Sequence, residues 1–170
     1  MPRKPHEAMF SPAVRAAKRR LGSSDVIEHQ VQRQRWKNRL TNVQMEFIQA
    51  SDSMYMGTAS LDGQPYIQHR GGSPGFVQVE SASQLWFLDF AGNLQYISVG
   101  NVSENPLGFL FFMDYRAQRR LKLWGRLSLD ENIRGARALL PTDYPAEIER
   151  KIIFDIDAID ENCPSHIKPR

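Results

Sequence analysis

Residues 65–76 read Pro65-Tyr66-Ile67-Gln68-His69-Arg70-Gly71-Gly72-Ser73-Pro74-Gly75-Phe76. The first six have the character of a strand, and the two adjacent glycines then open a loop in which the backbone can approach a ligand closely. Side chains alternate along a strand, so Gln68 and Arg70 share one face and His69 lies on the other. The segment therefore predicts a strand that carries polar and cationic groups up to a glycine-rich loop.

Other segments around this one also have strand character. Residues 54–60 precede it, and Asp62-Gly63 between the two is a strong β-hairpin signal. Short apolar runs or apolar residues at every second position mark five further segments, namely 76–79, 85–89, 107–113, 119–129 and 151–158. The pattern predicts six or so antiparallel strands in a closed or split barrel. Because side chains fill a small barrel, we expect a ligand on its outside or at a subunit boundary.

Helices are expected mainly in the first fifty residues. Ser11-Pro12 predicts a helix over 12–21, which Gly22 ends. A second helix is expected over 24–38, and Thr41 caps a third. Residues 1–50 are thus predicted to be a helical N-terminal extension, and residues 51–170 to be the barrel domain.

Two helices are also expected between the later strands. They cover 93–104 and 132–140, and a proline follows each, at Pro106 and Pro141. The tail from Ile159 to Arg170 is expected to be rich in turns.

Composition limits the class of protein. The chain has 170 residues, an ordinary charged fraction of 24% and one cysteine, Cys163. No apolar run approaches the roughly 18 residues that a membrane span needs, and the start of the chain lacks the apolar region of a secretory signal. One cysteine excludes an internal disulfide framework. We expect a cytoplasmic protein.

Positive charge is concentrated at the start of the chain. Ten Lys and Arg residues face four Asp and Glu residues within 1–50, although the whole chain carries only +3. Such a basic arm has two readings, a nucleic-acid contact or the solvated faces of helices. The charges lack the aromatic interleaving that single-stranded nucleic acid uses for stacking, so we do not expect nucleic-acid binding.

A second polar segment follows the strand at 85–89. It reads Asp89-Phe90-Ala91-Gly92-Asn93-Leu94-Gln95-Tyr96-Ile97-Ser98 and is predicted to open the helix at 93. The N-terminus of a helix offers N–H groups to a phosphate. From spacing alone, a tight turn with a helix cap explains Gly92-Asn93 equally well.

Four segments, in their order along the chain, resemble one branch of the pyridoxamine 5′-phosphate oxidase-related, FMN-binding split-barrel family. They are Tyr66-Ile67-Gln68-His69-Arg70-Gly71-Gly72, the segment from Asp89 to Ser98, Arg119-Arg120-Leu121-Lys122-Leu123-Trp124-Gly125-Arg126, and Asn162-Cys163-Pro164-x-His166-Ile167. The resemblance implies a mainly β, six-stranded Greek-key split β-barrel with peripheral helices, and a homodimer that holds FMN at its interface. It also implies seven cofactor-binding candidates, Gln68, His69, Arg70, Asn93, Gln95, Ser98 and Lys122.

The chain departs from true pyridoxamine phosphate oxidases at two places. Its Gly92-to-Gln95 turn carries no cation, and Ile159 to Arg170 shows no match for the family's substrate-binding arginine and histidine. These departures argue against oxidation of vitamin B6 phosphates. We expect an FMN-dependent oxidoreductase that moves hydride or electrons between a small donor and an acceptor. The flavin performs this chemistry, so no catalytic side chain is assigned.

One alternative is a non-catalytic carrier or sensor of flavin or haem, in which His69 and His166 are the haem ligands to test. Cys163 and His166 could also form half of a zinc site, but the sequence offers no second pair of Cys or His ligands. We therefore expect no metal.

Overall fold

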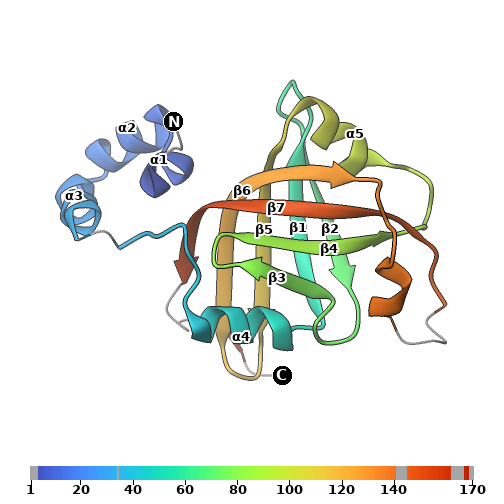
Figure 1. Cartoon of the computed structure of the whole chain (residues 1–170). Helices are drawn as coiled ribbons and strands as arrows, with labels where there is room; N and C mark the ends of the chain where they lie inside the picture. The colour runs from blue at the N-terminus through green and yellow to red at the C-terminus, as the bar shows by residue number, and fades with distance from the viewer. Residues whose placement is uncertain (1–3, 34, 141–144, 162–166, 169–170) are drawn as a thin grey trace.

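The computed structural model describes residues 4–33, 35–140, 145–161 and 167–168. Its body is one antiparallel sheet of seven strands in the spatial order β2-β1-β5-β6-β7-β4-β3, curved into a barrel (Figure 1). The strands are β1 (Ser53–Ala59), β2 (Pro65–Gly71), β3 (Val77–Ser81), β4 (Gln84–Phe90), β5 (Leu107–Asp114), β6 (Arg119–Asp130) and β7 (Ile148–Glu161). No ladder among the described residues joins the edge strands β2 and β3, so the barrel is split.

The expected mainly β class and split barrel are confirmed, but the strand count differs. Seven strands form where the resemblance implied six, because all seven segments with strand character pair in the sheet, and Val77–Ser81 is the short edge strand beside β4. The strand β7 is also longer than the predicted 151–158, since β6 and β4 pair with it on its two sides. Residues 159–161 consequently belong to this strand and not to a turn-rich tail.

The core follows the two-residue period of the strands. In β6 the side chains of Leu121, Leu123 and Leu127 are buried on the same face as Gly125, and those of Lys122, Trp124 and Arg126 alternate with them on the other face. Phe87, Phe112 and Phe154 are fully buried at the centre of the barrel. Each such side chain contributes roughly 1.5–3 kcal/mol by leaving water.

Two glycines leave room for one of these rings. Gly108 of β5 lies directly opposite Gly125 of β6. A Cβ added to Gly125 would lie 2.1 Å from the carbonyl oxygen of Asp155 and 2.6 Å from Cζ of Phe154. Any larger residue at 125 therefore collides with the neighbouring strand.

The helices α4 (Asn42–Ala50) and α5 (Ile97–Glu104) cover the two ends of the barrel (Figure 1). They bury Ile48 and Val102, respectively. The predicted cap at Thr41 is confirmed, since its hydroxyl accepts the Gln44 N–H at 3.3 Å and the Gln44 side chain accepts the Thr41 N–H at 3.1 Å.

The helices α1 (Pro5–Met9), α2 (Pro12–Arg20) and α3 (Ser24–Gln32) lie beside the barrel, and α1 contacts β7 (Figure 1). None of their residues is buried. The helix expected over 24–38 ends at Gln32, because the chain that follows pairs with the sheet: Lys37 accepts the Ile159 N–H at 2.8 Å. The domain boundary at residue 50 stays a prediction.

The segment between β6 and β7 differs from the helix that the sequence predicts there. The predicted helix over 132–140 is a turn followed by the short 3-10 helix η1 (Ala136–Leu139). Asp130 and Asn132 accept backbone N–H groups of Asn132 and Arg134, which favours turns over a regular helix. Among the described residues, no helix has the length and apolar character needed to cross a membrane.

Candidate functional site

A pocket of about 210 Å³ lies at the open side of the barrel, between β2 and the end of β4. Gln68 and Arg70 line it, and they stand opposite the buried residues Met56 and Met54 in the β1–β2 ladder. They therefore lie on the inner face of β2. The other lining residues come from the end of β4, the loop after it, the start of α5 and β7: Asp89, Phe90, Gly92, Asn93, Leu94, Gln95, Tyr96, Ile97, Ser98, Val99 and Glu149, with Tyr66 from β2.

A buried carboxylate in the lining of this pocket forms ion pairs with two arginines. Asp89, only 4% exposed, accepts from Arg70 across the split and from Arg150 Nη1 of β7 at 3.0 Å. Glu149 accepts from the other Arg150 nitrogen, Nη2, at 3.1 Å. The two positive charges are thus balanced by two carboxylates within the protein.

One donor in this group is still available. The Arg70 Nε is buried and forms no hydrogen bond with the described residues. A buried guanidinium nitrogen without an acceptor costs free energy. A ligand acceptor in the pocket would remove that cost.

The loop before α5 sets the second side of the pocket. Leu94 and Tyr96 have φ values of 59° and 50°, and the Asn93 side chain accepts the Gln95 N–H at 3.2 Å. These left-handed residues delay the helix, which begins at Ile97 and not at the predicted residue 93. Its first turn has no side-chain cap and lines the pocket, so the donors expected from Gly92-Asn93 come instead from Ile97 to Val99.

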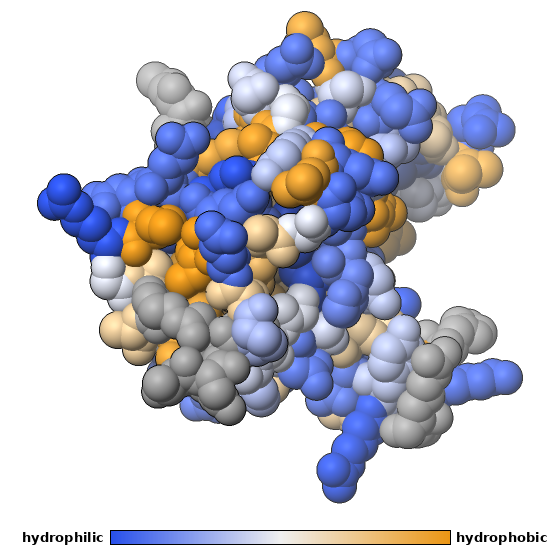
Figure 2. All heavy atoms as spheres, turned by 90° about the vertical axis from the view of Figure 1, so that its right-hand side faces the viewer, coloured by the Kyte–Doolittle hydropathy of each residue, from blue (hydrophilic) through white to orange (hydrophobic). Residues whose placement is uncertain are grey.

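Two side-chain hydrogen bonds join this loop and the first turn of α5 to the strands. Ser98, which is 4% exposed, donates its hydroxyl to the Gln68 side-chain oxygen at 2.9 Å. The Tyr96 hydroxyl donates to Glu149 at 2.7 Å, and this bond raises the pKa of Tyr96. Figure 2 views the molecule from the side that is on the right in Figure 1, and there polar groups lie among separate apolar patches.

The seven predicted site residues divide into two groups. Five line the pocket: Gln68, Arg70, Asn93, Gln95 and Ser98. His69 and Lys122 do not. The His69 ring packs against Tyr55 with centroids 5.6 Å apart, and Lys122 Nζ lies 3.6 Å from a carboxylate oxygen of Asp160. The predicted separation of His69 from Gln68 and Arg70 is confirmed.

His69 and Lys122 share the outer face of the sheet with a large apolar groove. Its volume is about 850 Å³, and Tyr55, Ile67, Leu107, Phe109 and Phe111 are among the residues that line it. Ile67 is 70% exposed. An apolar surface of this kind commonly marks an interaction site.

Sequence reasoning missed the lining carboxylates Asp89 and Glu149, and Arg150, which pairs with both of them. Asp89 carried a signal, because a carboxylate at the end of an apolar strand is rarely buried without partners. Arg150 and Glu149 carried none, since they lie in an ordinary charged stretch before β7. In the part of the chain that the structure describes, no three His, Cys, Asp or Glu side chains are grouped so as to hold a metal ion. Cys163 and His166 lie outside that part.

Solved structures of other proteins share this fold. HupZ from Group A Streptococcus is 12% identical, and the alignment covers 77% of this chain and 100% of that chain with a TM-score of 0.59. A protein assigned to the pyridoxamine 5′-phosphate oxidases from Lactobacillus delbrueckii is 19% identical, with 73% and 95% covered and a TM-score of 0.56. An FMN-binding protein from Syntrophomonas wolfei is 14% identical, with 69% and 82% covered and a TM-score of 0.50.

A scan against protein-family models and a search of curated proteins each give no match. At these identities the structural likeness shows the fold. The resemblance to the FMN-binding split barrels is therefore confirmed as a likeness of fold.

Proposed function

We propose that the protein binds FMN in the pocket at the split of the barrel and acts as an FMN-dependent oxidoreductase. One observation carries the proposal: Arg70 and the uncapped first turn of α5 line the same pocket, and the buried Arg70 Nε has no hydrogen-bond partner among the described residues. Both offer N–H donors to an anion. A phosphate group fits this donor set better than a neutral ligand does.

The remaining pocket residues suit the polar parts of a flavin. The amide nitrogens of Gln68, Asn93 and Gln95 form no hydrogen bond with the described residues around the pocket and can donate to ring or ribityl oxygens. Ser98 holds Gln68 in place. The flavin, once bound, supplies the hydride or electron transfer. The donor and acceptor are expected to be small molecules, and the single cysteine keeps the cytoplasm as the proposed location.

The site is proposed to be completed by a second copy of the chain. The pocket, at about 210 Å³, is smaller than the 300–1,000 Å³ typical of sites that enclose drug-sized ligands. The outer face, with its apolar groove, is the surface that a homodimer would cover. Since His69 and Lys122 lie on that face, they can reach a flavin only across such an interface.

Association is tested by sedimentation of the purified protein. We expect a dimer for the natural chain. Ile67→Asp places a charge in the groove and should yield monomers, whereas Arg116→Ala at the β5–β6 turn should remain dimeric. A monomeric natural chain, or a dimeric Ile67→Asp protein, contradicts the proposed interface.

The cofactor is tested by the visible absorption spectrum of the purified protein and by chromatography of whatever acid releases. Flavin bands and released FMN are expected. A Soret band would favour the haem-binding alternative. A colourless protein that also fails to bind added FMN contradicts both.

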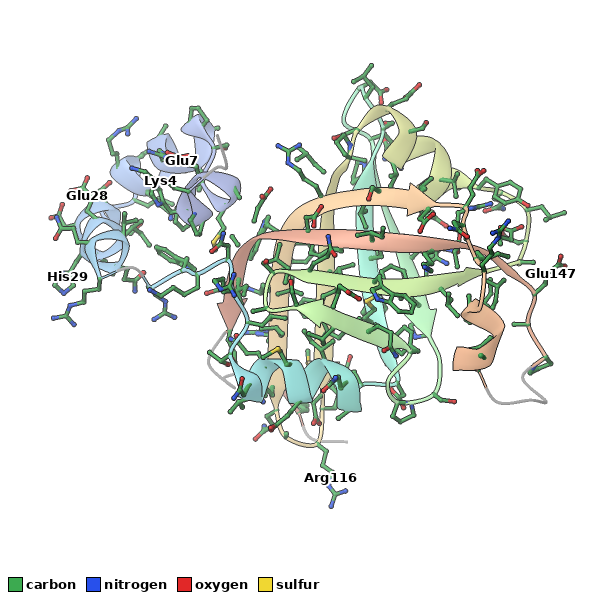
Figure 3. The ribbon with its side chains drawn as sticks, viewed as in Figure 1. Lys4, Glu7, Glu28, His29, Arg116 and Glu147 are labelled. Carbon is green, nitrogen blue, oxygen red and sulfur yellow. The ribbon has the colours of Figure 1, made fainter. Side chains whose placement is uncertain are left out.

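The role of Arg70 is tested by comparing FMN with riboflavin, which lacks the phosphate. Arg70→Ala should weaken FMN about ten- to a hundredfold, because a charge-assisted contact is worth roughly 1.5–3 kcal/mol, and should weaken riboflavin much less. Arg116→Ala is the matched control, since Arg116 projects from the end of the barrel away from Glu147 and α5 (Figure 3). Equal losses for both ligands would remove Arg70 from the phosphate site.

A further inference from the structure

The three N-terminal helices line a second, open hollow that shares no residue with the proposed flavin pocket. Its volume is about 480 Å³, within the range of small-molecule sites. Figure 3 shows these helices beside the barrel, with Lys4 and Glu7 near α1 and Glu28 on α3. The hollow is lined from α1, α2, α3 and the turn after α1 by His6, Phe10, Arg15, Lys18, Arg19, Ser24, Ile27, Glu28, Val31 and Gln32.

Lys18 is the unusual residue of this hollow. Its ammonium is shielded from solvent and forms no hydrogen bond or ion pair with the described residues. It lies over the Phe10 ring, 3.0 Å from the centroid. Burial, followed by the nearby charge of Arg15, lowers the pKa of Lys18. A cation held in this way lacks the counter-charge that a buried ammonium normally has.

The charges around Lys18 also favour an anionic ligand. Arg15 and Arg19 also line the hollow, and neither forms an ion pair with any described residue. The Arg15 Nε donates only to the Phe10 carbonyl oxygen, at 3.1 Å. The one lining carboxylate, Glu28, forms no ion pair with these cations among the described residues. The hollow is therefore a net positive site.

Its remaining walls are apolar. Phe10 lies on one side, and Ile27 and Val31 of α3 lie on the other, spaced four residues apart so that they share a helix face. We propose that this hollow binds a small free anion with an apolar body, whose carboxylate or phosphate pairs with Lys18 and whose apolar part packs against Ile27 and Val31. Binding would also stabilise helices that have no buried residue of their own.

The experiment titrates the full-length protein with octanoate and follows the methyl NMR signals of Ile27 and Val31. Saturable shifts of both residues are expected with octanoate. Octan-1-ol, which has the same chain without the charge, should bind at least about tenfold more weakly, because it lacks the charge-assisted contact. Equal affinity for the two compounds, or unchanged Ile27 and Val31 signals, overturns the proposal.

Two substitutions that each remove one positive charge test whether octanoate contacts Lys18. Lys18→Met keeps the length of the side chain and should weaken octanoate about ten- to a hundredfold. Arg20→Met removes a charge from the same helix outside the hollow and should change the affinity less than about threefold. Equal losses would mean attraction to general positive charge and would overturn the site. Should Lys18→Met change the far-ultraviolet circular dichroism, Arg19→Met, which also lines the hollow, must show the selective loss.

A last experiment distinguishes binding of a free anion from binding to a lipid surface. Vesicles of phosphatidylglycerol present the same anionic chemistry on a membrane. Binding to these vesicles without binding to octanoate would overturn the proposal in favour of membrane attachment. Because the hollow and the flavin pocket share no residue, the FMN spectrum tests the proposed function separately.

Discussion

In the barrel, Phe87, Phe112 and Phe154 are fully buried, whereas no residue of α1, α2 or α3 is buried. The barrel gains its stability from apolar area removed from water, and strands far apart in the chain share that core. The N-terminal helices depend on local features. Ser11 caps α2 by accepting the Val14 N–H at 3.3 Å, and Gly22 takes a φ of +71° after it. The same chain thus contains a region set by packing and a region set by caps and turns.

This contrast also separates the two candidate sites. The proposed flavin pocket is built on strands of the packed barrel, where the Arg70–Asp89–Arg150 group is held from three strands. The hollow among the N-terminal helices is formed by helices without buried residues, and a bound ligand would help to stabilise them. Preorganised sites favour affinity, because less conformational freedom is lost on binding.

The largest difference between the regions is expected from matched truncations. Phe154→Ala should lower the free energy of unfolding by about 3–5 kcal/mol, because it removes a fully buried ring and leaves a cavity. Ile27→Ala should lower it by less than about 1 kcal/mol, since no residue of α3 is buried. Urea denaturation followed by tryptophan fluorescence measures both. Similar losses would contradict the contrast.

A smaller difference is expected from glycine substitutions. Gly125→Ala should cost about 1–3 kcal/mol of global stability by overpacking against Asp155 and Phe154. Gly22→Ala, the same chemical change, should cost about 1–2 kcal/mol through its left-handed φ of +71°. Hydrogen exchange should show the Gly22→Ala effect only in α2 and α3. Loss of protection throughout the barrel would show that the helices are coupled to it.

The smallest effect concerns acid stability where α4 meets the sheet. Burial raises the pKa of Glu161, but hydrogen bonds from Arg119 and Gln44 outweigh it, so the pKa lies below its ordinary value of 4.5. Glu161 should therefore stabilise the fold above pH 4.5 and lose this contribution as the pH falls through the folded-state pKa. The side chain is partly exposed, so the effect should be under about 1 kcal/mol.

Denaturation at several pH values measures this effect. Glu161→Gln should flatten the acid limb of the stability curve. Glu28→Gln in the helical extension, where the carboxylate has no ion pair among the described residues, should leave the curve unchanged. A steeper limb in Glu161→Gln would contradict the assignment.

Local patterns predicted much of what is local in the structure. The two-residue period placed Gln68 and Arg70 opposite His69, and the cap at Thr41 begins α4. The period of the side chains and the chemistry of a cap depend on a few neighbouring residues, so they can be read along the chain. The start of α5 was misplaced, because Leu94 and Tyr96 adopt a left-handed conformation that their residue types do not signal.

The sequence by itself determined the strands, the alternation of their faces and the polar residues that β2 and the following loop present. Only the tertiary structure decided that Asp89 forms an ion pair with Arg150, which lies 61 residues away along the chain. It likewise decided that Arg70 pairs with the same carboxylate across the split. It also decided that His69 and Lys122 would lie on the outer face beside an apolar groove. The reason is physical: strand character is a property of short segments, whereas the partner of a buried charge depends on the order in which those strands pair.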